Sequence, residues 1–205
     1  MATLTEEPPV RRKRGRPRDP GVEDAALGAA RALLLEKGMG GCTIAAVAQT
    51  AGVGKGTIYL RWPDKESLIV DAMAEGVEDV AHPDTGSIAG DLRAMVDGMT
   101  EFLSGERGRL IATTVGELPR YPRLQALYDE RVLIPVSEIV GQVLERGRKR
   151  GEVRKGIDPV QFADLLFGPL FARLVLWQGD FPKGFGKMIV DVAVEGIRPK
   201  TVSYT

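Results

Sequence analysis

The stretch Thr43–Trp62, TIAAVAQTAGVGKGTIYLRW, decides the fold of the first third of this chain. Apolar residues repeat at helical spacing before and after Gly52, so the stretch predicts two short helices joined by a tight turn. Gly52 suits that turn because glycine adopts the positive φ that it requires, and Thr43 is a suitable N-cap for the first helix. This helix-turn-helix leaves one face of its second helix free, and a helix of that width fits the major groove of DNA.

Helical periodicity continues on both sides of this unit. Upstream, alanines and leucines between Val22 and Leu34 form one apolar stripe, and the glycines of Gly38–Gly41 end that helix. Downstream, Asp64 is the expected N-cap of a helix whose apolar side runs to Val80. We therefore expect a DNA-binding domain over residues 20–80, with a three-helix core that contains the helix-turn-helix.

The remaining residues, 81–205, are predicted to form a larger helical domain. Its helices are expected at Ile88–Leu103, Leu110–Leu118, Leu124–Arg148, Asp158–Gln178 and Phe185–Ala193. Pro135 is expected to bend the longest of them, and the basic run Arg146–Arg150 is interpreted as a solvated helix end. No stretch of useful length alternates as a strand would, so the predicted fold class is all-α with about nine helices in total.

Composition limits the class of protein. With 43% hydrophobic and 27% charged residues, the chain of 205 residues resembles an ordinary soluble globular protein. No stretch approaches the roughly 20 uncharged apolar residues of a membrane helix, and no secretory signal is recognisable. The single cysteine, Cys42, allows no intramolecular disulfide, and the single histidine, His82, has no companion for a metal site. We expect a cytoplasmic protein without metal or cofactor, and no triad or phosphate-binding loop indicates an enzyme.

Charge is distributed unevenly along a chain whose net charge is zero. Residues 1–65 carry 11 Lys and Arg against 7 Asp and Glu, a balance of +4, whereas residues 66–205 carry 17 against 21, a balance of −4. Such asymmetry is typical of a nucleic-acid-binding arm on an otherwise neutral body. Residues 1–19, which contain three prolines and no helical periodicity, are therefore predicted to be a flexible basic arm.

The arm contains VRRKRGRPR at Val10–Arg18, with six positive charges and no acid. Its inner RGRPR resembles the core of an AT-hook, a motif that lies along a narrow minor groove whose negative potential attracts arginine. The resemblance implies minor-groove contacts for Arg14, Arg16 and Arg18. The alternative is a solvated tail that attracts DNA without regard to sequence.

Three consecutive blocks of the sequence resemble the tetracycline-repressor (TetR) family of regulators. They are LLLEKGMGGCT at 33–43, IAAVAQTAGVGKGTIY at 44–59 and WPDKESLIVDAM at 62–73. The order and spacing of the three blocks make the resemblance highly specific. It implies a sequence-specific DNA-binding transcriptional regulator: a homodimeric repressor that a small apolar ligand releases from a palindromic operator.

A set of DNA-contacting residues follows from this resemblance and from the free face of the second helix. Polar side chains there suit phosphate oxygens or base edges, and N–H groups at helix starts favour phosphate. The predicted set is Thr43, Lys55, Gly56, Thr57, Tyr59, Arg61 and Lys65. The alternative for Lys55, Arg61 and Lys65 is that they are merely solvated charges, whereas Ile58 and Trp62 are expected in the core.

Two departures from the family pattern concern the same helix. Gly54 stands where relatives commonly place a serine, and glycine supplies no hydroxyl to cap the helix. Leu60 and Arg61 stand where the family often has aromatic residues or histidine. The base preference of relatives therefore cannot be transferred to this chain.

The stretch RGEVRKGIDPVQFADLLFGPLFARLVL at 150–176 also resembles a C-terminal domain type of this family. The resemblance implies a homodimer held by a four-helix bundle, to which each subunit contributes Pro159–Trp177 and Phe185–Ile197. The first of these helices supports the bundle independently, because a helix that is apolar nearly all round needs cover on two sides. A two-fold axis then places the recognition helices about 34–36 Å apart on a palindrome.

A ligand pocket is expected among the central helices of the C-terminal domain. Its predicted apolar lining is Met95, Met99, Phe102, Tyr128, Phe167, Phe171 and Trp177, each with ordinary core packing as the alternative. A ligand would favour one of two separations of the recognition helices. The alternative function is a helical small-molecule sensor or carrier with a vestigial helix-turn-helix.

Overall fold

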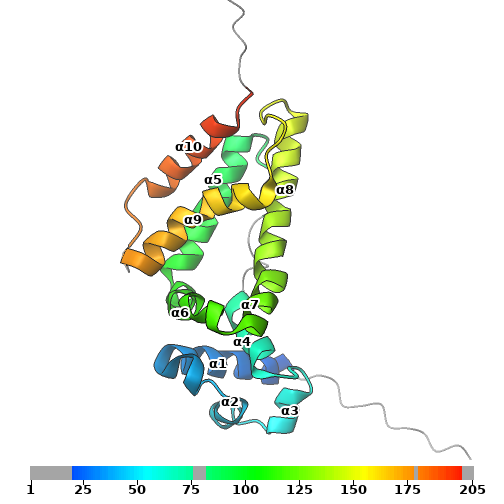
Figure 1. Cartoon of the computed structure of the whole chain (residues 1–205), viewed down its shortest axis with the longest axis vertical. Coiled ribbons are helices and arrows are strands. Elements are labelled where there is room, and N and C mark those ends of the chain that lie inside the picture. Colours follow the sequence, from blue (N-terminus) through cyan, green and yellow to red (C-terminus); the bar gives the residue numbers. More distant parts are fainter. Residues whose placement is uncertain (1–19, 76–81, 178–179, 200–205) are drawn as a thin grey trace, which may run out of the picture.

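The computed structural model describes residues 20–75, 82–177 and 180–199. Within these ranges the backbone forms ten α-helices, one 3-10 segment and one π segment, and no strand, which confirms the all-α prediction (Figure 1). The predicted basic arm, with Arg14, Arg16 and Arg18, lies outside the described residues. So does the segment 76–81, where the predicted boundary between the two domains falls.

The N-terminal domain lies at one end of the elongated molecule, with α2 and α3 farthest from α10 (Figure 1). Its helices are α1 (Pro20–Gly41), α2 (Ile44–Ala51), α3 (Lys55–Tyr59) and α4 (Lys65–Ala74). As predicted, Thr43 caps α2, since its Oγ1 accepts a hydrogen bond from the Ala46 N–H at 3.1 Å. Gly52 ends α2 in the left-handed region with a φ of 68°. Asp64 caps α4, because its Oδ1 accepts from the Ser67 N–H at 2.8 Å.

The second helix of the helix-turn-helix, α3, is called the recognition helix here, and it is shorter than the sequence predicts. It was expected to continue to Trp62, but α3 ends at Tyr59. The following residues still form helical turns, since the N–H of Trp62 donates to the Ile58 carbonyl at 2.9 Å. Pro63, which has no N–H to donate, ends this extension.

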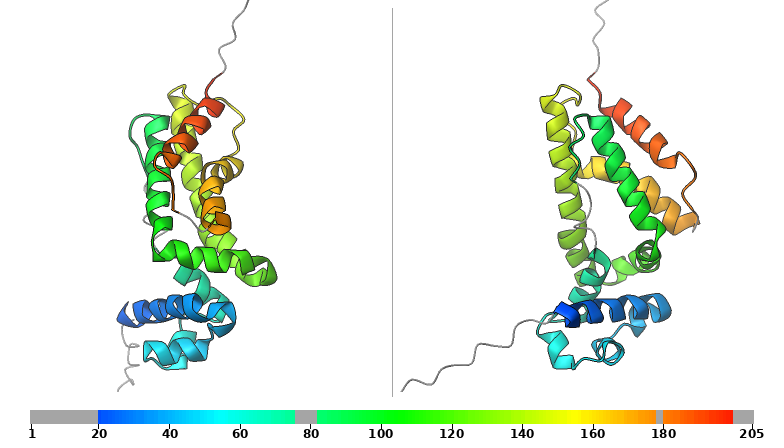
Figure 2. Two further views of the ribbon diagram at one scale, coloured as in Figure 1. Left: turned by 90° about the vertical axis from the view of Figure 1, so that its left-hand side faces the viewer. Right: turned by 180° about the vertical axis from the view of Figure 1, so that it is seen from behind.

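The C-terminal domain contains six α-helices, of which those at Ile88–Ser104 and Ile134–Lys149 run along the molecule (Figure 2). The helices are α5 (Ile88–Ser104), α6 (Glu106–Thr114), α7 (Pro122–Tyr128), α8 (Ile134–Lys149), α9 (Pro159–Trp177) and α10 (Phe185–Ile197). The 3-10 segment Val115–Arg120 joins α6 to α7, and the π segment Asp129–Leu133 joins α7 to α8. The helix predicted at Leu110–Leu118 therefore starts earlier and ends as a 3-10 turn.

The bend predicted at Pro135 is a π segment immediately before the proline. Proline lacks an N–H, and its ring clashes with the carbonyl four residues earlier, here that of Arg131. The preceding turn accordingly widens to a π turn, a common way for a long helix to absorb such a defect. When α7, the π segment and α8 are taken as the one bent helix of the prediction, the described residues contain nine helices.

Two apolar cores stabilise the molecule, and their limits do not coincide with the boundary between the two domains. The first contains the buried side chains of α1–α4 together with Leu110, Leu118, Leu124, Tyr128 and Val132 from the C-terminal elements. The second lies among α5, α8, α9 and α10. The region from α6 to the π segment therefore packs against the N-terminal domain, and the two domains share an apolar interface.

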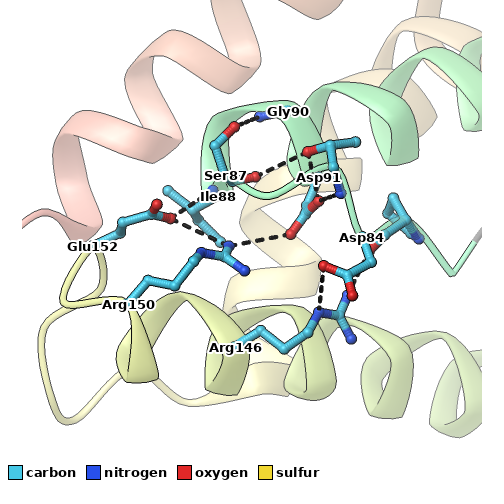
Figure 3. Close-up of polar contacts among 10 residues, drawn as sticks. Asp84, Ser87, Ile88, Gly90, Asp91, Arg146, Arg150 and Glu152 are labelled. Atoms are coloured by element: carbon cyan, nitrogen blue, oxygen red, sulfur yellow. Dashed lines mark hydrogen bonds and ion pairs between the residues drawn. The ribbon is translucent and has the colours of Figure 1, made fainter.

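A buried carboxylate, that of Asp91, lies in the first turn of α5 and joins it to neighbouring segments (Figure 3). Asp91 is fully buried and accepts hydrogen bonds from the Thr85 N–H at 2.6 Å and from its Oγ1 at 2.7 Å. Arg150 approaches the same carboxylate, with its Nη2 at 3.3 Å from Oδ2 (Figure 3). Burial opposes ionisation of Asp91, but these donors outweigh it and lower its pKa.

The interpretation of Arg146–Arg150 as a solvated helix end was wrong for three of its arginines. Arg146 donates to the Pro83 carbonyl at 2.5 Å, and Arg148 donates to the Ile157 carbonyl at 2.7 Å. Arg150 pairs with Asp91 and with Glu152, as Figure 3 shows. These arginines tie α8 to the loops before α5 and α9, contacts that helical periodicity alone does not reveal.

Candidate DNA-binding site

The free face of the recognition helix is exposed to solvent. Lys55 and Gly56 at the start of α3 are exposed, and so are Tyr59 at 54% and Leu60 at 86%. Ile58, on the opposite side, is fully buried. The helix therefore presents a mixed polar and apolar side outward while its inner side holds it in the domain.

Trp62 anchors the end of α3 to α4. The ring is buried in the N-terminal core, as predicted, with 3% of its surface exposed. In addition, its Nε1–H donates to Asp71 Oδ2 at 2.8 Å. A buried indole N–H normally requires such a partner, so the position of Asp71 on α4 helps to fix the orientation of the recognition helix.

Arg61 lies beside α1 as well as α3. Its Nε donates to Glu23 Oε2 at 3.3 Å, and only 15% of its side chain is exposed. Thr57 is half-buried. A direct DNA contact by either residue stays a prediction, and Arg61 already contributes a link between two helices of the domain.

Thr43 and Lys65 lie at the starts of α2 and α4. Thr43 is exposed and uses its oxygen as the α2 cap, which leaves its hydroxyl hydrogen available to a phosphate. The Lys65 ammonium lies 5.5 Å from the ring centroid of Tyr121, a cation–π arrangement with the C-terminal domain. At the start of α3, Gly54 occupies the N-cap and supplies no side-chain cap bond, as its lack of a hydroxyl predicts.

Two carboxylates of the DNA-binding domain accept hydrogen bonds from arginines of the C-terminal domain. Asp64 accepts from Arg123 Nη2 at 2.6 Å and from its Nε at 2.9 Å. Burial opposes ionisation of Asp64, but the hydrogen bonds from Ser67 and Arg123 outweigh it and lower its pKa. Asp71 Oδ1 accepts from Arg131 Nη1 at 2.5 Å, so one carboxylate contacts both Trp62 and the π segment.

Sequence reasoning missed these links between the domains. The partners are 59 residues apart for Asp64 and Arg123 and 60 apart for Asp71 and Arg131. Nothing in the local pattern marks either pair, because helical periodicity describes which face is apolar and not which charges meet across it. The one available hint was the N-cap aspartate, whose second oxygen remains free to accept a further donor.

The predicted ligand-lining residues do not all come together. Met95, Met99, Phe102, Phe167 and Phe171 share the C-terminal core. Tyr128 instead packs in the N-terminal core, where burial raises the pKa of its hydroxyl to about 12, and Trp177 at the end of α9 is 65% exposed. A ligand role for these seven residues stays a prediction.

A cavity of about 820 Å³ lies between α1, α6 and the end of α9. Its walls include Leu35, Leu103, Arg109, Thr113, Leu174 and Phe181, so both domains contribute to it. The volume is within the usual range for small-molecule sites, about 300–1,000 Å³. None of the seven predicted lining residues belongs to these walls, because the cavity forms where three distant segments meet.

The helices α9 and α10 carry exposed apolar residues. They are Val160, Leu165, Leu176, Trp177, Met188 and Val192, each more than half exposed. Among the described residues, α9 alone is long and apolar enough to cross a membrane by length and composition, a test that core helices of soluble proteins also pass. Only 28% of its most apolar window is buried within this subunit, so much of the helix remains uncovered.

A short, anchored helix with an exposed mixed face, mounted on a helical core and followed by a larger helical domain, defines a helix-turn-helix transcriptional regulator. Comparison with family models makes the class more specific. The model for bacterial regulatory proteins of the tetR family matches residues 26–72. The model for the tetracyclin repressor-like C-terminal domain matches residues 82–193. The chain belongs to the TetR family of transcriptional regulators.

Individual relatives agree with this assignment. The chain is 34% identical over 187 residues to the uncharacterized HTH-type transcriptional regulator YdeS of Bacillus subtilis (strain 168), covering 91% of this chain and 94% of the relative. It is 30% identical over 178 residues to the HTH-type transcriptional regulator AqdR of Rhodococcus erythropolis, covering 84% of each. The crystal structure of the TetR family transcription regulator SCO0332 is similar with a TM-score of 0.69 and 28% identity, over 87% of this chain and 99% of that one. These relatives are transcriptional regulators rather than enzymes.

Proposed function

We propose that this chain is a cytoplasmic, dimeric repressor that binds a palindromic operator through α3 and leaves it when a small apolar ligand binds. The observation that carries the proposal is the outward face of α3. Lys55, Gly56 and Tyr59 are exposed on it, while Ile58 and Trp62 hold the helix rigidly from behind. Such a rigid, exposed helix can enter a major groove without rearrangement of the domain.

The exposed apolar residues of α9 and α10 support the proposal that the protein is a dimer. Six large apolar side chains on these helices are more than half exposed, an arrangement that is unusual for a monomer and typical of an interface. A second copy of the chain, related by a two-fold axis, would cover both helices with the same residues. Light scattering is expected to give twice the 22.2 kDa mass of the chain.

The cavity beside α6 supports the proposal that the protein binds a small-molecule ligand. Apolar and polar residues both line it, and Leu35 of the DNA-binding domain forms part of its wall together with residues of α5, α6 and α9. A molecule bound there would contact both domains and could favour one angle between them. Ligands are sought by thermal shift, in which saturation at 100 times the Kd adds about 2.7 kcal/mol to the free energy of unfolding.

A gel shift with DNA from the promoter region of the protein's own gene tests the central claim. We expect a specific, salt-sensitive complex with a Kd in the range of about 10⁻⁸ to 10⁻¹¹ M. Tyr59→Phe, at an exposed position, is expected to lower the affinity and leave the melting temperature unchanged. Weak binding that ignores sequence would instead favour a small-molecule sensor whose helix-turn-helix is vestigial.

A further inference from the structure

Leu60 is the most exposed large apolar side chain in the part of the chain that the structure describes, with 86% of its surface accessible. Ten large apolar side chains are exposed in that part, and eight of them lie on C-terminal elements between Leu133 and Val192. The other two are Tyr59, the last residue of α3, and Leu60, its C-cap. An apolar side chain is therefore held in solvent at the one surface of the N-terminal domain that is proposed to contact DNA.

The backbone fixes this placement. Leu60 has helical φ and ψ of −68° and −22°, and its N–H donates to the Gly56 carbonyl at 3.1 Å. It therefore lies one helical turn after Gly56, on the same exposed side. The buried side chains of Ile58 and Trp62 prevent the turn from rotating, so Leu60 cannot fold back into the core.

A leucine has no donor or acceptor, which limits what it can recognise in a major groove. Phosphates and most base-edge groups are polar, and the one apolar group that the four bases present there is the C5-methyl of thymine. Lys55 and Tyr59 beside it suit polar partners. A protein partner does not fit the patch, because two neighbouring side chains are far smaller than the roughly 800 Å² that each partner buries in a stable interface.

We propose that Leu60 contacts the C5-methyl group of a thymine in each half-site and makes that base pair a determinant of sequence specificity. The proposal rests on the proposed DNA-binding function of α3. It assigns to Leu60 a role that the TetR-family assignment leaves open, since the leucine offers only apolar contact.

The experiment uses the full-length protein and a library of random-sequence DNA duplexes. Sequences that the wild type selects are resynthesised with thymine or with uracil, which lacks only the 5-methyl group, at each position in turn. At one position per half-site we expect uracil to weaken binding by about fourfold, the usual effect of burying one methyl-sized group. Leu60→Ala should bind the thymine and uracil duplexes equally at that position.

Leu60→Ala is expected to fold normally, because the side chain is exposed and alanine favours helix. An unchanged melting temperature and an unchanged salt dependence of binding confirm that only an apolar contact was removed. The matched control is Ala45→Gly, at an exposed position on α2, which should keep the thymine preference of the wild type.

Failure of this proposal is distinguishable from failure of the proposed function. If the wild type selects no sequence, the DNA-binding function itself is wrong. If it selects a sequence but tolerates uracil at every position, the function stands and the role of Leu60 is overturned. The role is also overturned if Leu60→Ala retains the wild-type sensitivity to uracil.

Discussion

Arg61, a predicted DNA contact, also has a structural partner in the DNA-binding domain. Its Nε lies 3.3 Å from Glu23 on α1, and most of its side chain is covered. From the sequence, Arg61 is expected either to contact DNA or to be a solvated charge. In the structure its side chain forms an ion pair with Glu23 on α1. Substitution of Arg61 alone would therefore remove both a positive charge beside α3 and the ion pair with Glu23 on α1.

Comparison of Arg61→Ala with Glu23→Gln separates the two roles. If Arg61 contacts a phosphate, Arg61→Ala should weaken binding and reduce the slope of log affinity against log salt by about 0.9 per phosphate. Glu23→Gln should keep the slope, because the positive charge of the Arg61 guanidinium remains in place. Titrations at several salt concentrations measure both. Equal reduction of affinity in the two variants, with unchanged slopes, would mean that Arg61 only positions the helix.

Because Asp91 is buried with its carboxylate ionised, we expect the free energy of unfolding to fall at acid pH. Its folded-state pKa is lowered from the usual 3.8, so its contribution to stability is complete above that value and disappears as pH falls through the lower, folded-state pKa. Asp91→Asn should destabilise the protein at neutral pH by about 1–3 kcal/mol, because it removes the negative charge and replaces one buried acceptor oxygen by an NH2 group that faces donors. It should also flatten the fall in stability below about pH 4.

Urea unfolding at a series of pH values measures this effect. Asp97→Asn is the matched control, because Asp97 is an exposed carboxylate on the same helix. If Asp91→Asn keeps the acid dependence of the wild type, other carboxylates dominate acid unfolding.

At the level of elements, the caps and turns were predictable because they depend on a few neighbouring residues. The cap residues Thr43 and Asp64 and the glycine turn at Gly52 are all found where the sequence placed them. The bend near Pro135 was also predictable in position, but its form was not. Whether a long helix absorbs a proline by a kink or by a π turn depends on what packs around it.

The role of the predicted basic arm, residues 1–19, can be tested by measurements of DNA binding. Deletion of residues 1–18 is expected to weaken binding and to lower the salt slope by about 0.9 for each phosphate that the arm neutralises. Replacement of Arg14, Arg16 and Arg18 by lysine keeps the charge but removes the side chain that narrow minor grooves favour. Under the minor-groove interpretation, the lysine variant binds more weakly only to sites flanked by A·T base pairs. An unchanged salt slope after the deletion would show that the arm does not touch DNA.

At the scale of the whole molecule, the two domains are connected by apolar packing and by two arginine–aspartate pairs. Residues from α6 to the π segment complete the core of the DNA-binding domain, and Asp71 contacts both Trp62 and Arg131. We therefore expect the angle of α3 to be coupled to the C-terminal domain through α4. A repressor that responds to a ligand requires coupling of this kind.

Arg131→Gln tests this coupling at a site remote from the recognition helix. Removal of the charge should loosen α4 and reduce DNA affinity by roughly fivefold, the lower end of usual coupling energies. Little change in thermal stability is expected, because both side chains are more than a third exposed and such ion pairs contribute little. Glu130→Gln, an exposed neighbour in the same π segment, is the matched control. Identical DNA affinity of Arg131→Gln and the wild type would argue against a connection through Asp71.

The sequence alone determined the all-helical fold, the helix-turn-helix with its caps, and most of its buried residues, because each depends on spacing within a few turns of chain. The tertiary structure alone decided the partners of Arg61, Asp71 and Arg150, the location of the cavity beside α6 and the sharing of one core by both domains. Those features join segments that are distant in sequence, and helical periodicity specifies which face of a helix is buried without specifying what covers it.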